Sequence, residues 1–317
     1  MSRVEGVSSA AAVAPTASAH PAASRRELAG VSSSVLRLRR LRRLRTVAWY
    51  VLNCALAALF ILPLLSALSV ALTSPGHLFS GGISTVIPLH PSLVNFRQAW
   101  DSVPFLSWYE NSLKVAVLFT VGQLVSTSLT AYALAKLRFF GRKVLMVVVV
   151  TTLMIPFQAI MIPLFELMKD LHWINTLYPL WVPAFFGDTT GAFGIFIMRQ
   201  AFLSVPNSLS EAAQIEGAGH GKIFLRIFLP LAAPQLAVVA VFSFLNSWND
   251  FARPIIYLTG QSTMTVTGGL ASFATAYNVQ WGPLMAGTLL SIVPTLVVYV
   301  CAQRFFRPSL MGAGLRG

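Results

Sequence analysis

The chain has 317 residues, of which 56% are hydrophobic and only 10% are charged. Soluble domains have about a quarter of their residues charged, so this composition, with a mean hydropathy of +0.70, excludes an ordinary soluble protein and indicates a membrane protein. The net charge of +13 leaves two explanations open, nucleic-acid binding or the charge asymmetry of a membrane protein. The positions of the charges decide between them.

The N-terminal region changes character near residue 45. Residues 1–35 are rich in Ala, Ser and Val and show no periodicity, so we expect them to be disordered. The segment LRLRRLRRLRT follows, with six arginines between Arg37 and Arg45, and an apolar run then extends from Val47 to Leu72. A signal peptide has an apolar core of only about 7–15 residues. We therefore predict a disordered, basic, cytoplasmic extension over residues 1–45, followed by a retained first span.

Five further runs approach the roughly 20 apolar residues that cross a bilayer. Because lipid leaves no partner for a free backbone amide, every span is expected to be helical. The sequence thus predicts an all-α membrane protein with six transmembrane helices within residues 46–303 and a cytoplasmic tail at 304–317. The predicted spans are 47–72, 112–135, 144–166, 178–199, 231–249 and 284–302.

The basic residues are distributed unevenly between the two sides of this topology. With the N-terminus inside, 19 of the 23 lysines and arginines lie on the inner side. The four on the outer side are Arg97, Lys114, Lys169 and Arg253. This strong positive-inside bias explains most of the basic excess without nucleic acid, and the arginine run favours anionic inner-leaflet lipid. We predict a multi-pass membrane protein with both termini in the cytoplasm.

The inner loop between the fourth and fifth spans, residues 200–230, contains the unusual stretch EAAQIEGAGHGKIFLRIFLP. Ser210 is a candidate N-cap, which places Glu211 in a first helical turn, where the helix dipole favours a negative charge. The glycines that begin with Gly217 are expected to end this short helix. The apolar spacing of KIFLRIFLP then predicts a second helix, which leads into the fifth span.

A nucleotide or metal site in this loop is not supported. A Walker A motif needs Gly and Ser or Thr where this chain has Glu216 and Ile223. The glycines between Glu216 and His220 break the helical register that a metal pair would need. Cys54 and Cys301 stand alone in apolar runs. The chain is therefore expected to contain no catalytic residue, metal or cofactor of its own.

The loop and its neighbours resemble the carbohydrate-type permeases of bacterial ABC importers, the group to which the maltose transporter's MalG belongs. Glu211-Ala212-Ala213, Gly217 and the segment from Ile227 to Pro230 match the EAA loop of that family in spacing. The segments AYALAKLRFFGRK, GIFIMRQAF, SFLNSWNDFARPIIYL and LMAGTLLSIVPTL follow the family in order. The resemblance covers residues 45–317. Gly219 departs from the family's usual Ser, and the tail RPSLMGAGLRG matches only loosely.

The resemblance implies that the loop is a coupling helix that docks into a cleft on a cytoplasmic ATPase. The residues carried over for this role are Glu211, Ala212, Ala213, Gly217, Ile227 and Pro230. It also implies the partners: a second homologous permease, two ATPase subunits that hold ATP and Mg, and an extracytoplasmic solute-binding protein. The implied function is import of a sugar or oligosaccharide.

Polar residues within spans are candidates for the solute path. Asp188 interrupts the weak fourth span, where a broken helix can mark a binding site; the alternative places it at the outer surface. Asn246, Asn249 and Asp250 are predicted to share a helical face, with Trp248 adjacent; the alternative is an outer interfacial belt, where Trp is common. Gln158, between two prolines, is a further candidate.

Two other functions remain open. An ATPase-independent secondary transporter would need ionisable residues at depth, and the chain has hardly any. An ABC permease for a polyol, glycerol phosphate or another polar solute would have the same coupling loop, and the sequence does not separate it from a sugar importer.

Overall fold

The computed structural model describes residues 25–74, 91–188, 191–275 and 278–313. Within these ranges the secondary structure is helical, apart from two isolated bridge pairs, Thr73–Pro91 and Ala274–Val279. The predicted all-α class is therefore confirmed for the described residues. The chain divides into two units, residues 1–62 and residues 63–317, and each is described by itself.

The first helix, α1, extends from Arg25 to Leu72 and has Pro63 in its interior. The sequence predicted disorder up to residue 45, and for residues 25–45 this was wrong; residues 1–24 lie outside the described part of the chain. The physical reason is local propensity, because Leu, Arg and Ala are strong helix formers and the segment contains no proline after Pro21 until Pro63. Its apolar portion is the predicted first span.

Within the described residues, four segments are long and apolar enough to cross a membrane: Arg42–Leu72, Phe105–Lys136, Tyr178–Ser204 and Trp281–Arg304. Two further pairs of helices qualify only when taken together, and they bend by 98° and 81° at their breaks. The six predicted spans therefore correspond to four segments and two bent pairs. The second span is also longer than predicted, since it begins at Phe105 instead of residue 112.

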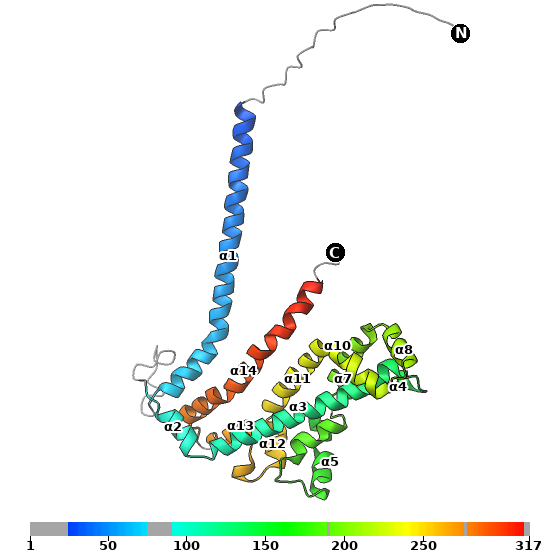
Figure 1. Ribbon diagram of the computed structural model, residues 1–317. Coiled ribbons are helices and arrows are strands. Elements are labelled where there is room, and N and C mark those ends of the chain that lie inside the picture. The colour runs from blue at the N-terminus through cyan, green and yellow to red at the C-terminus, as the bar shows by residue number, and fades with distance from the viewer. Residues whose placement is uncertain (1–24, 75–90, 189–190, 276–277, 314–317) are drawn as a thin grey trace, which may run out of the picture. The chain divides into compact units, whose positions relative to one another are not determined.

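The 63–317 unit is organised around α3, Phe105–Lys136. Helix α7, Gly191–Ser204, and helix α11, Ala233–Trp248, both pack against α3. Helix α14, Trp281–Ala313, packs against α11 and against α2, Val94–Asp101. Figure 1 shows α2 and α13, Val266–Leu270, near the beginning of α3 and α8, Asn207–Ile215, near its end. The two ends of α3 thus support two separate groups of residues.

The third predicted span, residues 144–166, is not one helix. Helix α4, Arg142–Thr152, ends before Pro156, and helix α5, Phe157–Asp170, begins after it at an angle of 98°. Proline has no amide hydrogen to donate and disfavours a helical residue before it, which explains why the helix breaks at Pro156. Hydropathy detected the apolar run but not the bend.

The fourth predicted span is interrupted where the sequence indicated. Helix α6, Tyr178–Trp181, continues as the 3₁₀ segment η3, Val182–Phe186, and ends at Gly187 with a left-handed φ of 87°. Helix α7 starts again at Gly191. The side chains of Asp188 and of the short helix α12, Ala252–Tyr257, come together beside this break.

Candidate functional site

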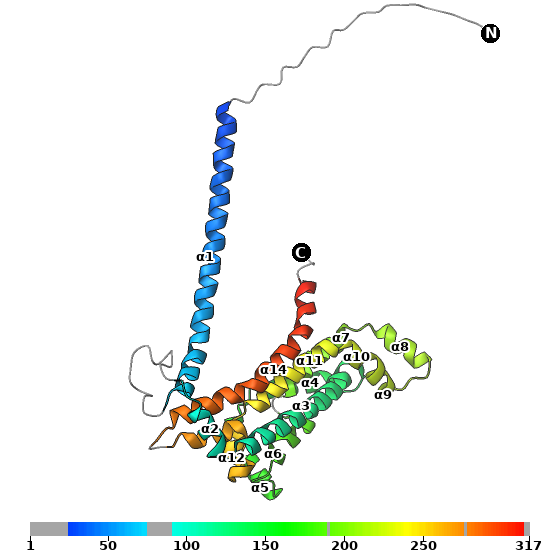
Figure 2. The same ribbon diagram turned by 60° about the vertical axis from the view of Figure 1, so that its left-hand side comes forward.

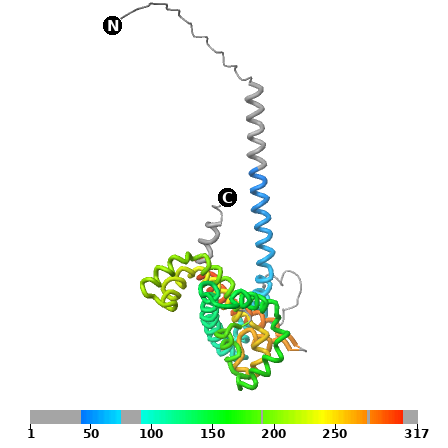
Figure 3. The backbone as a smooth tube through the Cα atoms, turned by 90° about the vertical axis from the view of Figure 1, so that its right-hand side faces the viewer, coloured from blue at the N-terminus to red at the C-terminus, as the bar shows by residue number. Residues whose placement is uncertain are grey.

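The predicted coupling loop contains an exposed helix, α8. Among its nine residues, all of which the structure describes, none is buried. Figures 2 and 3 show α8 and α9, His220–Ile223, in yellow-green at one end of the unit, standing out from the packed helices. Ile215 is 88% exposed, and Leu209, Glu211 and Ala212 are exposed as well. A helix that leaves apolar side chains in solvent has a surface available for a partner.

The start of α8 differs from the prediction. The helix begins at Asn207 after Pro206, and the Ser210 hydroxyl donates to the Asn207 carbonyl instead of capping the helix. Glu211 is therefore in the second turn, and the expected stabilisation by the helix dipole in a first turn was wrong. The sequence signal favoured Ser as a cap, whereas Pro206 fixes the backbone before the helix.

The end of α8 agrees with the prediction. Gly217 has a left-handed φ of 80°. The amide of Gly217 donates to Gln214 O at 2.9 Å, and that of Ala218 donates to Ala213 O at 2.9 Å. This pair of bonds is the Schellman motif, which satisfies the last carbonyls of a helix and reverses the chain. Gly217 thus sets the angle between α8 and the segment that follows.

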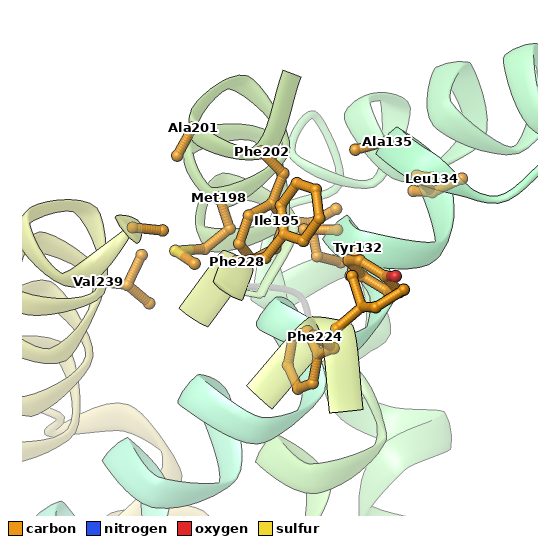
Figure 4. Packing of buried hydrophobic residues seen from close by; sticks show 13 residues of the cluster. Tyr132, Leu134, Ala135, Ile195, Met198, Ala201, Phe202, Phe224, Phe228 and Val239 are labelled. Atoms are coloured by element: carbon orange, nitrogen blue, oxygen red, sulfur yellow. The ribbon is translucent and has the colours of Figure 1, made fainter. Parts of the chain in front are cut away.

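An aromatic cluster fixes that following segment to the end of α3. After α9 come the π-helical residues Phe224–Phe228 (η4) and α10, Leu229–Leu231. Tyr132 of α3 lies 5.2 Å from Phe224 and 5.3 Å from Phe228 between ring centroids. Phe202 of α7 is in edge contact with Phe228. Figure 4 shows these rings meeting among buried side chains of α3, α7 and the loop.

Lys136, at the last turn of α3, connects to the beginning of α8 directly. Its Nζ donates to Val205 O at 2.8 Å and to Asn207 Oδ1 at 2.7 Å, and it lies 5.1 Å above the Phe228 ring. The Tyr132 hydroxyl and His220 Nδ1 are 3.3 Å apart and share a hydrogen bond. Side chains of α3 therefore hold the beginning of α8 and the helix α9 that follows it.

A groove of about 940 Å³ separates α8 from the segment that follows α3. Glu211 and Gln214 line one wall, and Lys136, Arg138 and Arg142 line the other. The remaining predicted coupling residues lie close by. Ala213 and Ile227 pack against the aromatic cluster from partly buried positions, and Pro230 lies exposed in α10.

The second group of polar residues surrounds a cavity of about 490 Å³ near the break in the fourth span. Four of the predicted path residues line it: Gln158, Asp188, Asn246 and Asp250. They come from α5, from the turn after η3, from α11 and from the residues just beyond α11. The structure thus brings together residues that are far apart in sequence.

An ion-pair triad forms one wall of this cavity. Arg253 donates through Nε to Asp250 Oδ2 at 2.5 Å and through Nη1 to Asp188 Oδ2 at 3.2 Å. The side chain of Arg253 is 12% exposed and each aspartate 15%. The guanidinium also lies 5.1 Å above the ring of Phe119 in α3, an arrangement that favours a cation.

Burial and charge act in opposite directions on this arginine. Burial by itself lowers the pKa of Arg253, but the carboxylates of Asp250 and Asp188 outweigh it, so the pKa of Arg253 is raised above its ordinary value. Burial raises the pKa of Tyr257, which also lines the cavity. Arg253 is therefore a permanent cation, and Tyr257 a neutral phenol, at physiological pH.

A smaller cavity of about 340 Å³ adjoins the first along α11. Val239, Ser243 and Asn246 line it, at spacings of four and three residues that place them on one helical face. Asn246 borders both cavities. One face of α11 therefore carries a continuous set of lining residues, and Asp250 follows just beyond its C-terminal end.

A family model described as "Binding-protein-dependent transport system inner membrane component" matches residues 124–310, which contain the α8 loop and both cavities. The chain belongs to this family. It is thus the inner-membrane permease component of a binding-protein-dependent transport system.

Several named transport permeases align along most of the chain. The arabinooligosaccharides transport system permease protein AraQ of Halalkalibacterium halodurans is 33% identical over 83% of this chain and 93% of its own length. The lactose transport system permease protein LacG of Rhizobium radiobacter is 32% identical, over 86% and 97%. The sn-glycerol-3-phosphate transport system permease protein UgpE of Yersinia pestis is 30% identical, over 78% and 89%.

Solved structures share the fold. A chain from the crystal structure of a bacterial ABC transporter involved in the import of the acidic polysaccharide alginate superposes with a TM-score of 0.72 at 24% identity. The match covers 84% of this chain and 98% of that one. A second alginate transporter structure, in complex with an alginate pentasaccharide-bound periplasmic protein, has a TM-score of 0.62 at 16% identity.

Two of the predicted path residues of this permease lie elsewhere. Trp248 is buried, donates through Nε1 to Ser291 O at 2.9 Å and stacks on Phe244. The Asn249 side chain donates to Leu245 O at 2.8 Å, within its own helix end. Neither Trp248 nor Asn249 is among the described residues that line the 490 Å³ cavity. Their sequence proximity to Asn246 and Asp250 did not place them on the same surface.

Three residues of these sites were missed from the sequence. Arg253 was counted only as an outer topological charge, although its spacing of three from Asp250 is that of a helical ion pair. Lys136 was counted only as an inner charge, and Tyr132 only as part of a resembling segment. Their partners, Asp188, Asn207 and His220, are more than 60 residues away in sequence, and no local pattern predicts such contacts.

Proposed function

We propose that this permease is one half of the transmembrane part of an ABC importer for a sugar or oligosaccharide. Its partners in this proposal are a second homologous permease, two ATPase subunits that hold ATP and Mg, and an extracytoplasmic solute-binding protein. Both termini then lie in the cytoplasm, as does the α8 loop. Names of relatives that transport arabinooligosaccharides and lactose support the solute class.

The observation that supports coupling to an ATPase is the way in which α8 is attached to the rest of the protein. The helix offers exposed side chains on its outer surface, while Lys136 and the aromatic cluster hold the segments before and after it. A protein without a nucleotide site of its own must receive work through a rigid contact. A helix with a free surface and fixed ends meets that requirement, because a force applied to it is transmitted to α3 and α11 instead of being absorbed by a flexible loop.

The charges of the groove support the same role. Glu211 and three basic residues line the same groove, so an inserted partner segment with both acidic and basic side chains finds counter-charges in it. Ile215 and Leu209 add an exposed apolar contact. We propose that Glu211, Ala212 and Ile215 contact the ATPase, and that Gly217, Ile227 and Pro230 keep the angle between the contact and the fifth span.

The deciding experiment is cross-linking in the complete transporter. An Ile215→Cys variant, with Cys54 and Cys301 replaced by Ser, is expected to cross-link to cysteines around the docking cleft of the ATPase. Glu211→Lys is expected to reduce this cross-link and solute uptake at least about tenfold, while Glu166→Lys, an exposed charge reversal on α5, leaves both unchanged. Absence of any ATPase cross-link, or normal uptake by Glu211→Lys, would contradict the proposal and favour an ATPase-independent transporter.

A further inference from the structure

The cavity near the break in the fourth span has an unequal set of charges. Among the described residues that line it, Asp188 and Asp250 are the acidic side chains and Arg253 is the one cation. The formal charges at neutral pH are −2 and +1, which leaves a net charge of −1. Because the three side chains are largely shielded from solvent, this charge is screened less than a surface charge would be.

Arg253 is already engaged by carboxylates. Nε and Nη1 donate to the two aspartates, and the backbone amide of Arg253 also donates to Asp250 Oδ1 at 3.3 Å. Phe119 covers the guanidinium from α3. An anionic solute would have to displace a carboxylate that is held in the same wall, and it would leave that carboxylate without its counter-charge. Such a loss is costly in a partly buried site.

The rest of the lining suits uncharged polar groups. Gln158 and Asn246 supply amides that both donate and accept hydrogen bonds. Phe157 and Tyr257 supply ring surfaces beside them. Hydroxyls and the apolar faces of a pyranose ring match this combination, whereas a phosphate or a carboxylate finds no free cation among the described lining residues.

We infer that the Asp188–Arg253–Asp250 triad is a charge filter that admits neutral or amino-bearing glycans and rejects uronates and sugar phosphates. This inference rests on the proposed function, since it names the solute class of the proposed importer. The names of relatives of similar fold indicate anionic cargo for the glycerol-3-phosphate and alginate transporters, and the filter predicts a different cargo for this chain. The filter acts on the solute directly and is additional to the selectivity of a binding protein.

The local charge can be measured without knowing the natural solute. In the complete purified transporter, with Cys54 and Cys301 replaced by Ser, Asn246→Cys places a thiol in the cavity. Its labelling rates with a cationic reagent, methanethiosulfonate ethyltrimethylammonium, and an anionic one, methanethiosulfonate ethylsulfonate, are followed on the Asn246 peptide by mass spectrometry. Gln261→Cys, an exposed position on η5, Gln261–Thr263, provides the matched control.

The expected cation-to-anion rate ratio at Asn246→Cys is at least about tenfold above that at Gln261→Cys, because an unscreened unit charge nearby shifts local ion concentrations by that order. Asp188→Asn, which makes the cavity neutral and retains the Arg253–Asp250 pair, is expected to bring the ratio close to the control. The inference is overturned if, with the triad intact, the cation-to-anion rate ratio at Asn246→Cys equals that at Gln261→Cys. It is also overturned if Asp188→Asn leaves the ratio at Asn246→Cys unchanged.

The solute class is then tested by protection of the same thiol. Maltotriose, a deacetylated chitosan trimer and trigalacturonate are compared at equal concentration as neutral, cationic and anionic probes. Maltotriose or the chitosan trimer is expected to slow labelling severalfold, and trigalacturonate not at all. Equal protection by trigalacturonate, or protection by none of the three, overturns the filter. Either result leaves the Ile215→Cys cross-link intact, so failure of the filter is distinguishable from failure of the proposed importer function.

Discussion

Two regions along α3, one at its end and one near its middle, are held in different ways. At the end near Lys136, buried rings of Tyr132, Phe202 and Phe228 pack against each other, and one lysine joins them to the exposed helix α8. In the second region, around Phe119 and Arg253, ion pairs and amides surround a cavity. The first region is filled and presents its functional surface outward, whereas the second keeps an interior space.

This difference follows from what each region has to do in the proposed importer. A contact that transmits force needs a packed and stiff support, and aromatic side chains provide large contact areas with few internal rotations. A passage for a polar solute needs space and exchangeable hydrogen bonds, which apolar packing does not supply. Substitutions that weaken one region without the other test whether the two roles are separate.

The largest effect is expected at the centre of the aromatic cluster. Phe228→Ala removes a fully buried ring that contacts Tyr132 and Phe202, and we expect a loss of about 3–5 kcal/mol in the free energy of unfolding. Thermal denaturation of the purified transporter in detergent measures it. Leu225→Ala, an exposed residue of the same π-helical turn, should lose far less; equal losses would show that the cluster is not the support of the loop.

The next largest loss in the free energy of unfolding is expected in the Asp188–Arg253–Asp250 triad. Arg253→Gln leaves Asp188 and Asp250 without their shared cation, and breaking a largely buried pair from one side costs roughly 3 kcal/mol. The same denaturation assay reads this loss, with the exposed Arg97→Gln as its control. Adding Asp188→Asn to Arg253→Gln should recover part of the stability. If the double variant is no more stable than the single one, repulsion between the carboxylates is not the cause.

A smaller effect is expected at the turn after α8. Gly217→Val places a β-branched residue at a φ of 80°, which costs about 1–3 kcal/mol through backbone strain alone, since a Cβ there meets no neighbour within 4 Å. We expect the ATPase cross-link at Ile215→Cys to fall while the cavity labelling ratio stays constant. Gly219→Val is the matched control, because Gly219 has an ordinary φ of −72° and is equally open.

The smallest effect is expected at Lys136. Lys136→Met keeps the apolar stem and removes two hydrogen bonds to the beginning of α8, a loss of about 1–2 kcal/mol. Amide hydrogen exchange of residues 205–216 should accelerate while exchange of α12 is unchanged. The exposed Lys143→Met controls for loss of a positive charge on the same side. Unaltered exchange in the Lys136 variant would mean that the aromatic cluster alone fixes α8.

How much of the molecule the sequence predicted depends on the range of the interaction involved. The apolar runs, the interruption of the fourth span around Asp188 and the end of the α8 helix at Gly217 were predicted because each depends on a few adjacent residues. The bend at Pro156 and the start of α8 at Asn207 were not predicted. At each place two local signals compete, the apolar run against Pro156 and Ser210 against Pro206, and the sequence does not show which one prevails. Because Ser210 was predicted to be the N-cap, Glu211 was assigned to the first turn of α8 instead of the second.

The composition and charge asymmetry of the sequence by themselves predicted a multi-span helical membrane protein, and the glycine pattern predicted where α8 ends, because periodicity and backbone propensity are local properties of the chain. Only the tertiary structure decided that Arg253 joins Asp188 to Asp250, that Lys136 holds the beginning of α8, and that Trp248 belongs to packing instead of the cavity. These contacts depend on how the bent helices pack against α3. Which side chains of a helix face a cavity and which face another helix is set by the rotation of that helix, and no local sequence pattern encodes this rotation.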